Sequence, residues 1–235
     1  MLTTILKLLA MIPMLILYAL RKFSASQSTS KKFLIFKKFV KKTIAVLCLL
    51  AFASNYGSNP PEPIIFNIVK NNSVIGSIKI TESKSKDSVI YTIDSEVEAQ
   101  FILKYKVVGK EKYIYKDGTL IYASLFRTLN NKVKTNHSIV YNQGHYSIQT
   151  PNKISPLNFD NIKQNLMTLY MTEPIGIESV FCDNQKQMVN VKSLGNGSYK
   201  VELSKGKYNI FHYKHGKCVK IVAVSPMFDV ILIPV

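Results

Sequence analysis

The stretch SVIYTIDSEVEAQFILKYKVVGKEKYIYKDGTL, residues 88–120, decides the fold class of the chain. In its first half apolar and polar side chains alternate; the apolar set is Tyr91, Ile93, Val97 and Ala99, and the polar set is Thr92, Asp94, Glu96 and Glu98. Such alternation is typical of a β-strand with one buried and one solvated face. Asp117-Gly118 then forms a pair that tolerates the positive φ of a tight hairpin turn. The stretch therefore predicts consecutive antiparallel strands.

The charges of this stretch support a strand pair that turns near residues 100–102. Its second half carries a stripe of lysines at Lys104, Lys106, Lys110, Lys112 and Lys116. A turn at that place puts Glu98 opposite Lys104 and Glu96 opposite Lys106. Cross-strand ion pairs of this kind contribute about 0.2–1 kcal/mol each. We interpret the charged stripes as a solvated sheet face whose charges complement each other.

The same pattern of strand and turn continues through residues 64–235. Turn signals recur at Asn71-Asn72, Asp117-Gly118, Asn130-Asn131, Gln143-Gly144, Gly195-Asn196-Gly197, Lys205-Gly206 and His215-Gly216. The segments between them alternate and are rich in β-branched and aromatic residues. We expect a mainly β domain of about a dozen strands: a curled antiparallel meander that forms a half-barrel or open barrel.

One segment, residues 158–171, has helical rather than strand spacing. Its apolar residues are Phe159, Ile162, Leu166, Leu169 and Tyr170. Asn158 or Asp160 would be the N-cap, and Pro174 would end the helix. We expect one amphipathic helix. One side of the curled sheet is then either covered by this helix or left open as a concave apolar face.

The first 61 residues differ in composition from the rest. The chain has 31 Lys+Arg and 14 Asp+Glu residues, a net charge of +17, but residues 1–61 hold nine of the basic residues and none of the acidic ones. Residues 62–235 therefore carry 22 basic and 14 acidic residues, a net of +8. More than half of the excess charge lies outside the expected β domain. Arg21 and Arg127 are the two arginines, and arginine is the usual base-reading residue, so we expect no nucleic-acid partner.

This first part resembles targeting sequence. Residues 31–53 have the order of a secretory signal peptide: a basic block, the apolar run TIAVLCLLAFA, and small residues that would allow cleavage after Ala53. Residues 1–30 begin with a hydrophobic segment, residues 1–20, which is either a genuine membrane anchor or an artefact of an upstream start. Residues 54–63 form a linker. Either way, we expect residues 64–235 to be exported across the inner membrane, to the periplasm or outer envelope.

A family resemblance rests on a spaced set of residues: Phe66, Gly76, Tyr91, Ser95, Val97, YKDGTL at 115–120, LYMTEP at 169–174, Val180, Phe181, Tyr199, Leu203 and NIFHYKHG at 209–216. This set resembles an uncharacterised secreted family of bacteroidetes, a domain of unknown function that is distantly similar to the half-barrel lipoprotein carriers of the cell envelope. The resemblance covers about residues 63–235. It implies a half-barrel fold and assigns no catalytic residue.

The candidate site residues are few. The concave face would be lined by Tyr91, Ile93, Val97, His137, Ile139, Tyr141, Val201 and Ile210, which we predict as the ligand-binding set. Cys182 and Cys218 are a candidate disulfide, because export would place them in an oxidising compartment and a bond forms if their Cα atoms lie within about 7 Å; the alternative is two buried or half-buried thiols. His212 and His215 are three apart on a strand and point to opposite faces, so no metal site is expected. No catalytic string and no cofactor motif occurs, so we predict no cofactor.

The sequence is compatible with three functions. The first is a non-enzymatic envelope protein whose concave face binds a lipid or another hydrophobic ligand. The second is a structural or assembly factor that is anchored in the membrane by residues 1–20 and binds a protein partner. The third is a hydrolase without a recognisable motif, which would need a cleft where His137 or His212 meets a carboxylate. The sequence leaves the oligomeric state undecided.

Overall fold

The computed structural model describes residues 62–100, 104–226 and 229–235. The expectations for residues 1–61 (hydrophobic segment, signal peptide and most of the linker) therefore lie outside the described part. The described residues belong to one compact unit that spans residues 60–235. Within them, no helix is both long and apolar enough to cross a bilayer.

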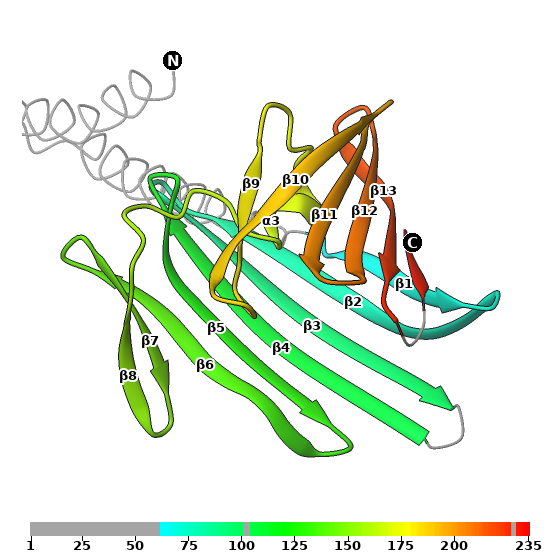
Figure 1. Ribbon diagram of the computed structural model, residues 1–235, viewed down its shortest axis with the longest axis horizontal. Coiled ribbons are helices and arrows are strands. Elements are labelled where there is room, and N and C mark those ends of the chain that lie inside the picture. The colour runs from blue at the N-terminus through cyan, green and yellow to red at the C-terminus, as the bar shows by residue number, and fades with distance from the viewer. Residues whose placement is uncertain (1–61, 101–103, 227–228) are drawn as a thin grey trace, which may run out of the picture. The chain divides into compact units, whose positions relative to one another are not determined.

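The unit consists of one fourteen-stranded antiparallel sheet, which curls and is drawn in Figure 1. Its order is β8-β7-β6-β5-β4-β3-β2-β1-β14-β13-β12-β11-β10-β9, so nearly every strand pairs with its sequence neighbours and β1 joins the two halves through β14. The strands are β1 Ile64–Lys70, β2 Ser73–Lys84, β3 Ser88–Gln100, β4 Lys104–Lys116, β5 Thr119–Leu129, β6 Lys132–Asn142, β7 His145–Thr150, β8 Lys153–Leu157, β9 Ser179–Cys182, β10 Gln187–Gly195, β11 Ser198–Ser204, β12 Lys207–Lys214, β13 Lys217–Val224 and β14 Val230–Pro234. The sheet does not pair β8 with β9, so the predicted open, curled meander is confirmed.

All seven predicted turns connect consecutive strands, whereas the β2–β3, β7–β8 and β9–β10 turns were not predicted. Positive φ angles occur at Asn71, Asn72, Asp117, Gly118, Asn130, Asn131, Gln143, Gly144, Gly195, Asn196, Gly197, Gly206, His215 and Gly216. Asparagine, aspartate and glycine tolerate this backbone region at low cost. Local turn chemistry thus fixes most of the connections of the meander.

The two faces of the sheet differ sharply. The inner, concave face holds the core, whose largest fully buried side chains are Tyr146, Phe66, Phe181, Phe211, Ile80, Leu120, Leu125, Ile139, Leu169, Ile221, Val180 and Val201. On the outer face of β3 and β4, Lys106 Nζ bridges Glu96 and Glu98, and Lys104 Nζ lies 3.6 Å from Glu98. The expected ion pairs form, although Glu98 is directly opposite Lys106 rather than Lys104.

The predicted helix over residues 158–171 is wrong in its extent. Only α3, Thr168–Met171, is helical. The preceding residues are not helical because their backbone bonds to other elements: Leu166 N donates to Phe181 O, Phe181 N donates to Gln164 O, and Ile162 N donates to the Tyr146 hydroxyl. These tertiary bonds replace the helical ones.

The segment still covers the concave face, as its apolar spacing suggested. In Figure 1, α3 lies between the long strands β2–β5 and the shorter strands β10–β13. The ring of Tyr170 contacts Phe66 of β1 at 5.5 Å and Phe211 of β12 at 5.8 Å, both edge to face. Tyr213 donates a hydrogen bond of 2.5 Å to Leu169 O. α3 is therefore an internal plug that joins the two halves of the curled sheet.

We predict that Gly76→Ala destabilises the domain by about 2 kcal/mol. Gly76 lies on β2 opposite Val97, where an added Cβ would be 2.2 Å from the backbone oxygen of Glu96. The matched control is Gly109→Ala on β4, where the nearest atom is the rotatable hydroxyl of Ser95. Urea denaturation of both variants measures the difference. Equal losses of stability would show that the close strand contact at Gly76 is not limiting.

Candidate functional site

A groove of about 380 Å³ lies on the inner face between the sheet and the segment around α3. Its apolar wall combines β1–β5 with α3, the two residues before α3, and β11 and β12; the residues are Ile68, Ile78, Ile93, Val97, Val107, Tyr113, Leu125, Leu166, Met167, Tyr170, Leu203 and Phe211. Its polar part is Ser95, Glu111, Arg127, Asp183, Asn184, Gln185 and Asn209. Its size falls in the range of small-molecule sites, about 300–1,000 Å³.

The polar part of the groove is built around an ion pair between two neighbouring strands. The Arg127 Nε donates to Glu111 Oε1 at 2.9 Å, and Arg127 Nη2 contacts the same oxygen. The Tyr113 hydroxyl donates to Glu111 Oε2 at 2.6 Å. Gly109 lies directly opposite Arg127, and a Cβ built there would be 3.6 Å from Arg127 Cγ. The arginine therefore lies across the strand beside a residue without a side chain.

Asp183, just after β9, is a fully buried carboxyl group beside this pair. It is 3% exposed, and Asn165 Nδ2 donates to its Oδ2 at 3.0 Å. Its Oδ1 has no hydrogen-bond partner among the described residues, and neither does the Tyr115 hydroxyl or His137 Nε2. Burial raises the pKa of Asp183 to about 7, and the nearby Glu111 carboxylate acts in the same direction. Near neutral pH this group therefore exchanges between a hydrogen-bond donor and an acceptor.

The predicted ligand-binding residues do not all reach the groove. Ile93 and Val97 line it, whereas Ile139 and Val201 are completely buried in the core. Ile210 lies on the outer face, because it pairs with Lys200 while Asn209 pairs with Val201. The expectation that Ile210 lines the concave face is therefore corrected.

The three remaining predicted residues lie on the inner face beyond the groove lining. Tyr141 packs against Tyr146 with ring centroids 4.7 Å apart, and Tyr91 makes an edge contact with Tyr115. His137 is buried opposite Leu125. Burial lowers the pKa of His137, so its neutral form is favoured.

A second hollow of about 420 Å³ lies where the β2–β3 and β4–β5 turns meet the plug. It is lined by turn and plug residues of both charges, including Lys86, Asp87, Asp117 and Lys163, together with Tyr91 and Tyr115. This hollow is slightly larger than the groove. Because most of its lining residues are polar, we regard the groove, with its apolar wall, as the better candidate for a hydrophobic ligand.

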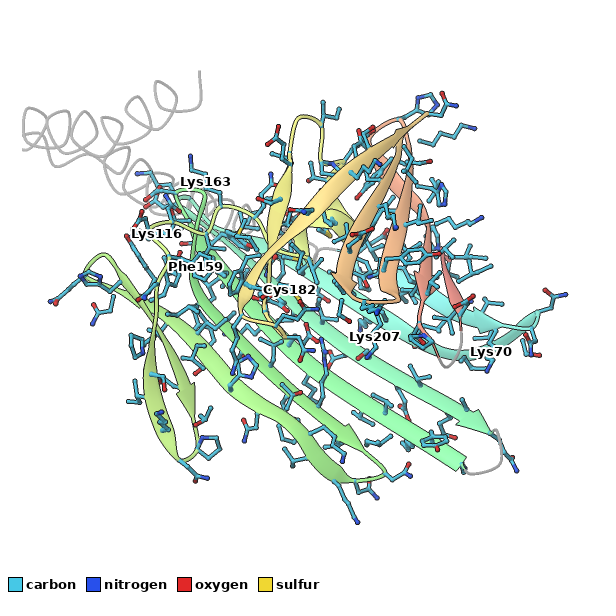
Figure 2. The ribbon with its side chains drawn as sticks, in the orientation of Figure 1. Lys70, Lys116, Phe159, Lys163, Cys182 and Lys207 are labelled. Atoms are coloured by element: carbon cyan, nitrogen blue, oxygen red, sulfur yellow. The ribbon has the colours of Figure 1, made fainter. Side chains whose placement is uncertain are left out.

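The candidate disulfide between Cys182 and Cys218 is not formed. Both cysteines are free and buried. Cys182 ends β9 and Cys218 is on β13, with β10, β11 and β12 between them in the sheet. Four strand spacings are about 19 Å along a sheet, far beyond the 7 Å that a disulfide spans. In Figure 2, Cys182 lies in the middle of the domain, where it also lines the groove.

We predict that neither thiol reacts with iodoacetamide in the native protein at pH 8. Burial raises the pKa of both thiols, that of Cys218 to about 11, and the thiolate is the reactive form. Mass spectrometry of peptides reads each cysteine separately, and both should become labelled only after unfolding without reductant. Native labelling at the rate of free cysteine, or a peptide pair linked by a disulfide, would contradict this.

Fold and groove together define an open β half-barrel with an internal plug and an amphipathic groove. Residues 66–235 match the family described as "Domain of unknown function (DUF6134)", and the chain belongs to this family. It is also similar to the structure described as the beta-barrel-like protein of domain of unknown function DUF1849 from Brucella abortus. The TM-score is 0.48 at 9% identity, and the match covers 76% of this chain and 98% of that one. No curated protein matches the chain.

Proposed function

We propose that the domain is an exported, non-enzymatic binding protein that holds a small hydrophobic or amphiphilic molecule in the groove. The observation that carries this proposal is an apolar groove of about 380 Å³ with its polar side chains gathered around Glu111, Arg127 and Asp183. Apolar walls with a few convergent polar groups are typical of ligand sites. A volume at the lower end of the range favours a single acyl chain over a lipid with several chains.

The chemistry of the polar groups favours binding over catalysis. Glu111 is only 9% exposed and accepts hydrogen bonds from both Arg127 and Tyr113. Both of its carboxylate oxygens are therefore engaged by side chains of the site itself.

Among the described residues, His137 Nε2 has no hydrogen-bond partner, so it is not part of a nucleophile–base pair. Ser198 and His212 do lie within hydrogen-bond distance, 3.0 Å from the hydroxyl oxygen to Nδ1, across β11 and β12. Neither residue lines the groove, and no carboxylate among the described residues bonds to His212, so this pair lacks the third group that would orient the histidine.

Export is supported by the sequence of residues 31–53, whose order is that of a signal peptide. The resemblance to half-barrel carriers of the cell envelope is consistent with the same location. The proposed ligand would therefore be a component of the envelope or a molecule that crosses it.

A fluorescent fatty acid, dansyl-undecanoic acid, tests the groove directly. We predict that a fragment starting at Pro60, where the compact unit begins, binds this probe with increased emission. Val107→Phe on the groove wall should weaken binding roughly tenfold, since a ring fills space that the probe needs. Val108→Phe, one residue along on the outer face of β4, is the matched control. The proposal fails if the wild-type fragment does not bind, or if both variants bind like the wild type.

A further inference from the structure

The outer face of the sheet is apolar around β1 and β14. Six residues form this apolar outer patch: Ile65, Val69, Val74, Val222, Ile231 and Ile233. The register makes them neighbours, because Val69 pairs with both Val74 and Ile231, and Ile231 pairs with Val222. Ile65, Val74, Ile231 and Ile233 are 36% to 60% exposed. Contiguous exposed apolar residues of this kind mark an interaction surface.

The outer face of β3–β6 is mixed: charged residues alternate there with a row of half-buried apolar ones, Ile90, Ile114, Tyr122 and Val140. On β3 and β4 the outer positions carry the ion pairs of Glu96 and Glu98 with Lys106. Phe126 on β5 is exposed to a similar degree, 38%, but Asn136 and Lys110 are its pairing partners. The apolar outer patch therefore differs from the apolar row on β3–β6 in that four of its residues are exposed.

Positive charge gathers in the same part of the sheet. Residues 186–235 contain eight lysines but only Glu202 and Asp229 as acidic residues, a net charge of +6. Lys79 lies opposite Ile65 on the outer face, and Lys220 precedes Val222 by two residues on β13. Lysines beside exposed aliphatic side chains fit an anionic lipid surface, since the aliphatic groups enter the headgroup boundary while the ammonium groups pair with headgroups.

In the sequence, an apolar run precedes β1 by a short linker. Residues 43–53 are apolar, and ten residues, 54–63, separate them from Ile64, the first residue of β1. Ten residues span at most about 36 Å when fully extended. An apolar run held in a bilayer would keep β1 within that distance of the membrane.

We propose that the apolar outer patch and the lysines around it dock the folded domain on an anionic lipid bilayer. The groove opens on the inner face of the same sheet, so docking leaves the proposed ligand site free. Docking does not depend on a ligand in the groove, so membrane docking and ligand binding can each fail without the other.

Quenching of a fluorophore in the full chain tests the proposal. The chain is reconstituted in vesicles of phosphatidylglycerol and phosphatidylcholine. One sample carries an NBD label on the cysteine of Ile233→Cys, in the apolar outer patch. The other carries the label on the cysteine of Phe126→Cys, outside the patch. Cys48 is replaced by serine, and Cys182 and Cys218 are buried, so the reagent reaches the introduced thiol. Doxyl-labelled lipid reports contact with the bilayer, and iodide reports contact with water.

We expect doxyl lipid to quench the label at position 233 and iodide to quench the label at position 126. Lys79→Gln and Lys220→Gln should each shift the docked population roughly fivefold, the usual contribution of one lysine near an anionic surface. Equal quenching in vesicles of pure phosphatidylcholine would overturn the role of the lysines. A label at position 233 that iodide quenches freely would overturn docking altogether. Protection from both quenchers would overturn it too, because a second copy or residues 43–53 would then cover the patch.

Discussion

Asp183→Asn is expected to raise the stability of the domain at pH 8 by about 2–4 kcal/mol and to flatten its dependence on pH. The folded state raises the pKa of Asp183 to about 7 because the carboxyl group is buried. An unfolded aspartate has a pKa of about 3.9. Between these values the folded state holds a proton that the unfolded state has released, so stability falls as pH rises from about 4 to 7. Asparagine does not titrate and removes this decline.

Urea denaturation at half-unit steps of pH measures this effect as the difference between wild type and variant. Burial lowers the pKa of His137 and His212, and this affects stability in the opposite direction. The stability that the two neutral histidines contribute is lost as pH falls below about 6.5. Both histidines remain in the variant, so their effects cancel in the difference. Asp94→Asn on the exposed outer face controls for the loss of one acidic residue. A difference curve that is flat from pH 4 to 8 would mean that Asp183 is charged and solvated.

Arg127→Met should destabilise the domain by about 3 kcal/mol, because it leaves the Glu111 carboxylate buried with one hydrogen-bond donor. The double variant with Glu111→Leu should recover most of this loss, since two apolar side chains replace the whole ion pair. A double-mutant cycle measures the coupling between the two residues.

The matched control for this cycle is an exposed ion pair on the neighbouring strands. Lys106→Met removes the contacts of Lys106 with Glu96 and Glu98, all 40% to 54% exposed, and should cost less than about 1 kcal/mol. If Arg127→Met costs no more than this control, the pair in the groove is screened by water and does not organise the site.

Local chemistry explains why the strands and turns were predictable. An Asn-Asn or Asp-Gly pair needs no distant partner to adopt positive φ, and alternation of side chains has a period of two. The register in which neighbouring strands pair was harder to predict. The sequence placed Glu98 opposite Lys104, whereas the structure pairs it with Lys106. A shift of two residues keeps every side chain on its own face, so alternation alone does not distinguish the two registers.

The helix and the site depended on contacts between distant parts of the chain. Residues 158–167 have helical spacing, but hydrogen bonds to Phe181 and Tyr146 take the place of helical ones. Glu111 lies between Lys110 and Lys112 and resembles part of the solvated stripe. Glu111 lies two residues before Tyr113, and residues two apart on a strand share a face, so Glu111 is on the inner face. This alternation is the feature of the sequence from which its position was predictable. Asp183 follows a four-residue strand, and nothing local indicates its burial.

Native mass spectrometry of the full chain, isolated from its own cells, shows whether the groove holds a hydrophobic molecule. We expect an added mass of one small apolar molecule per chain, which organic solvent removes. We also expect that Val107→Phe loses this mass while Val108→Phe retains it. A mass equal to that of the polypeptide in all three proteins, or the same added mass in both variants, would contradict the proposal.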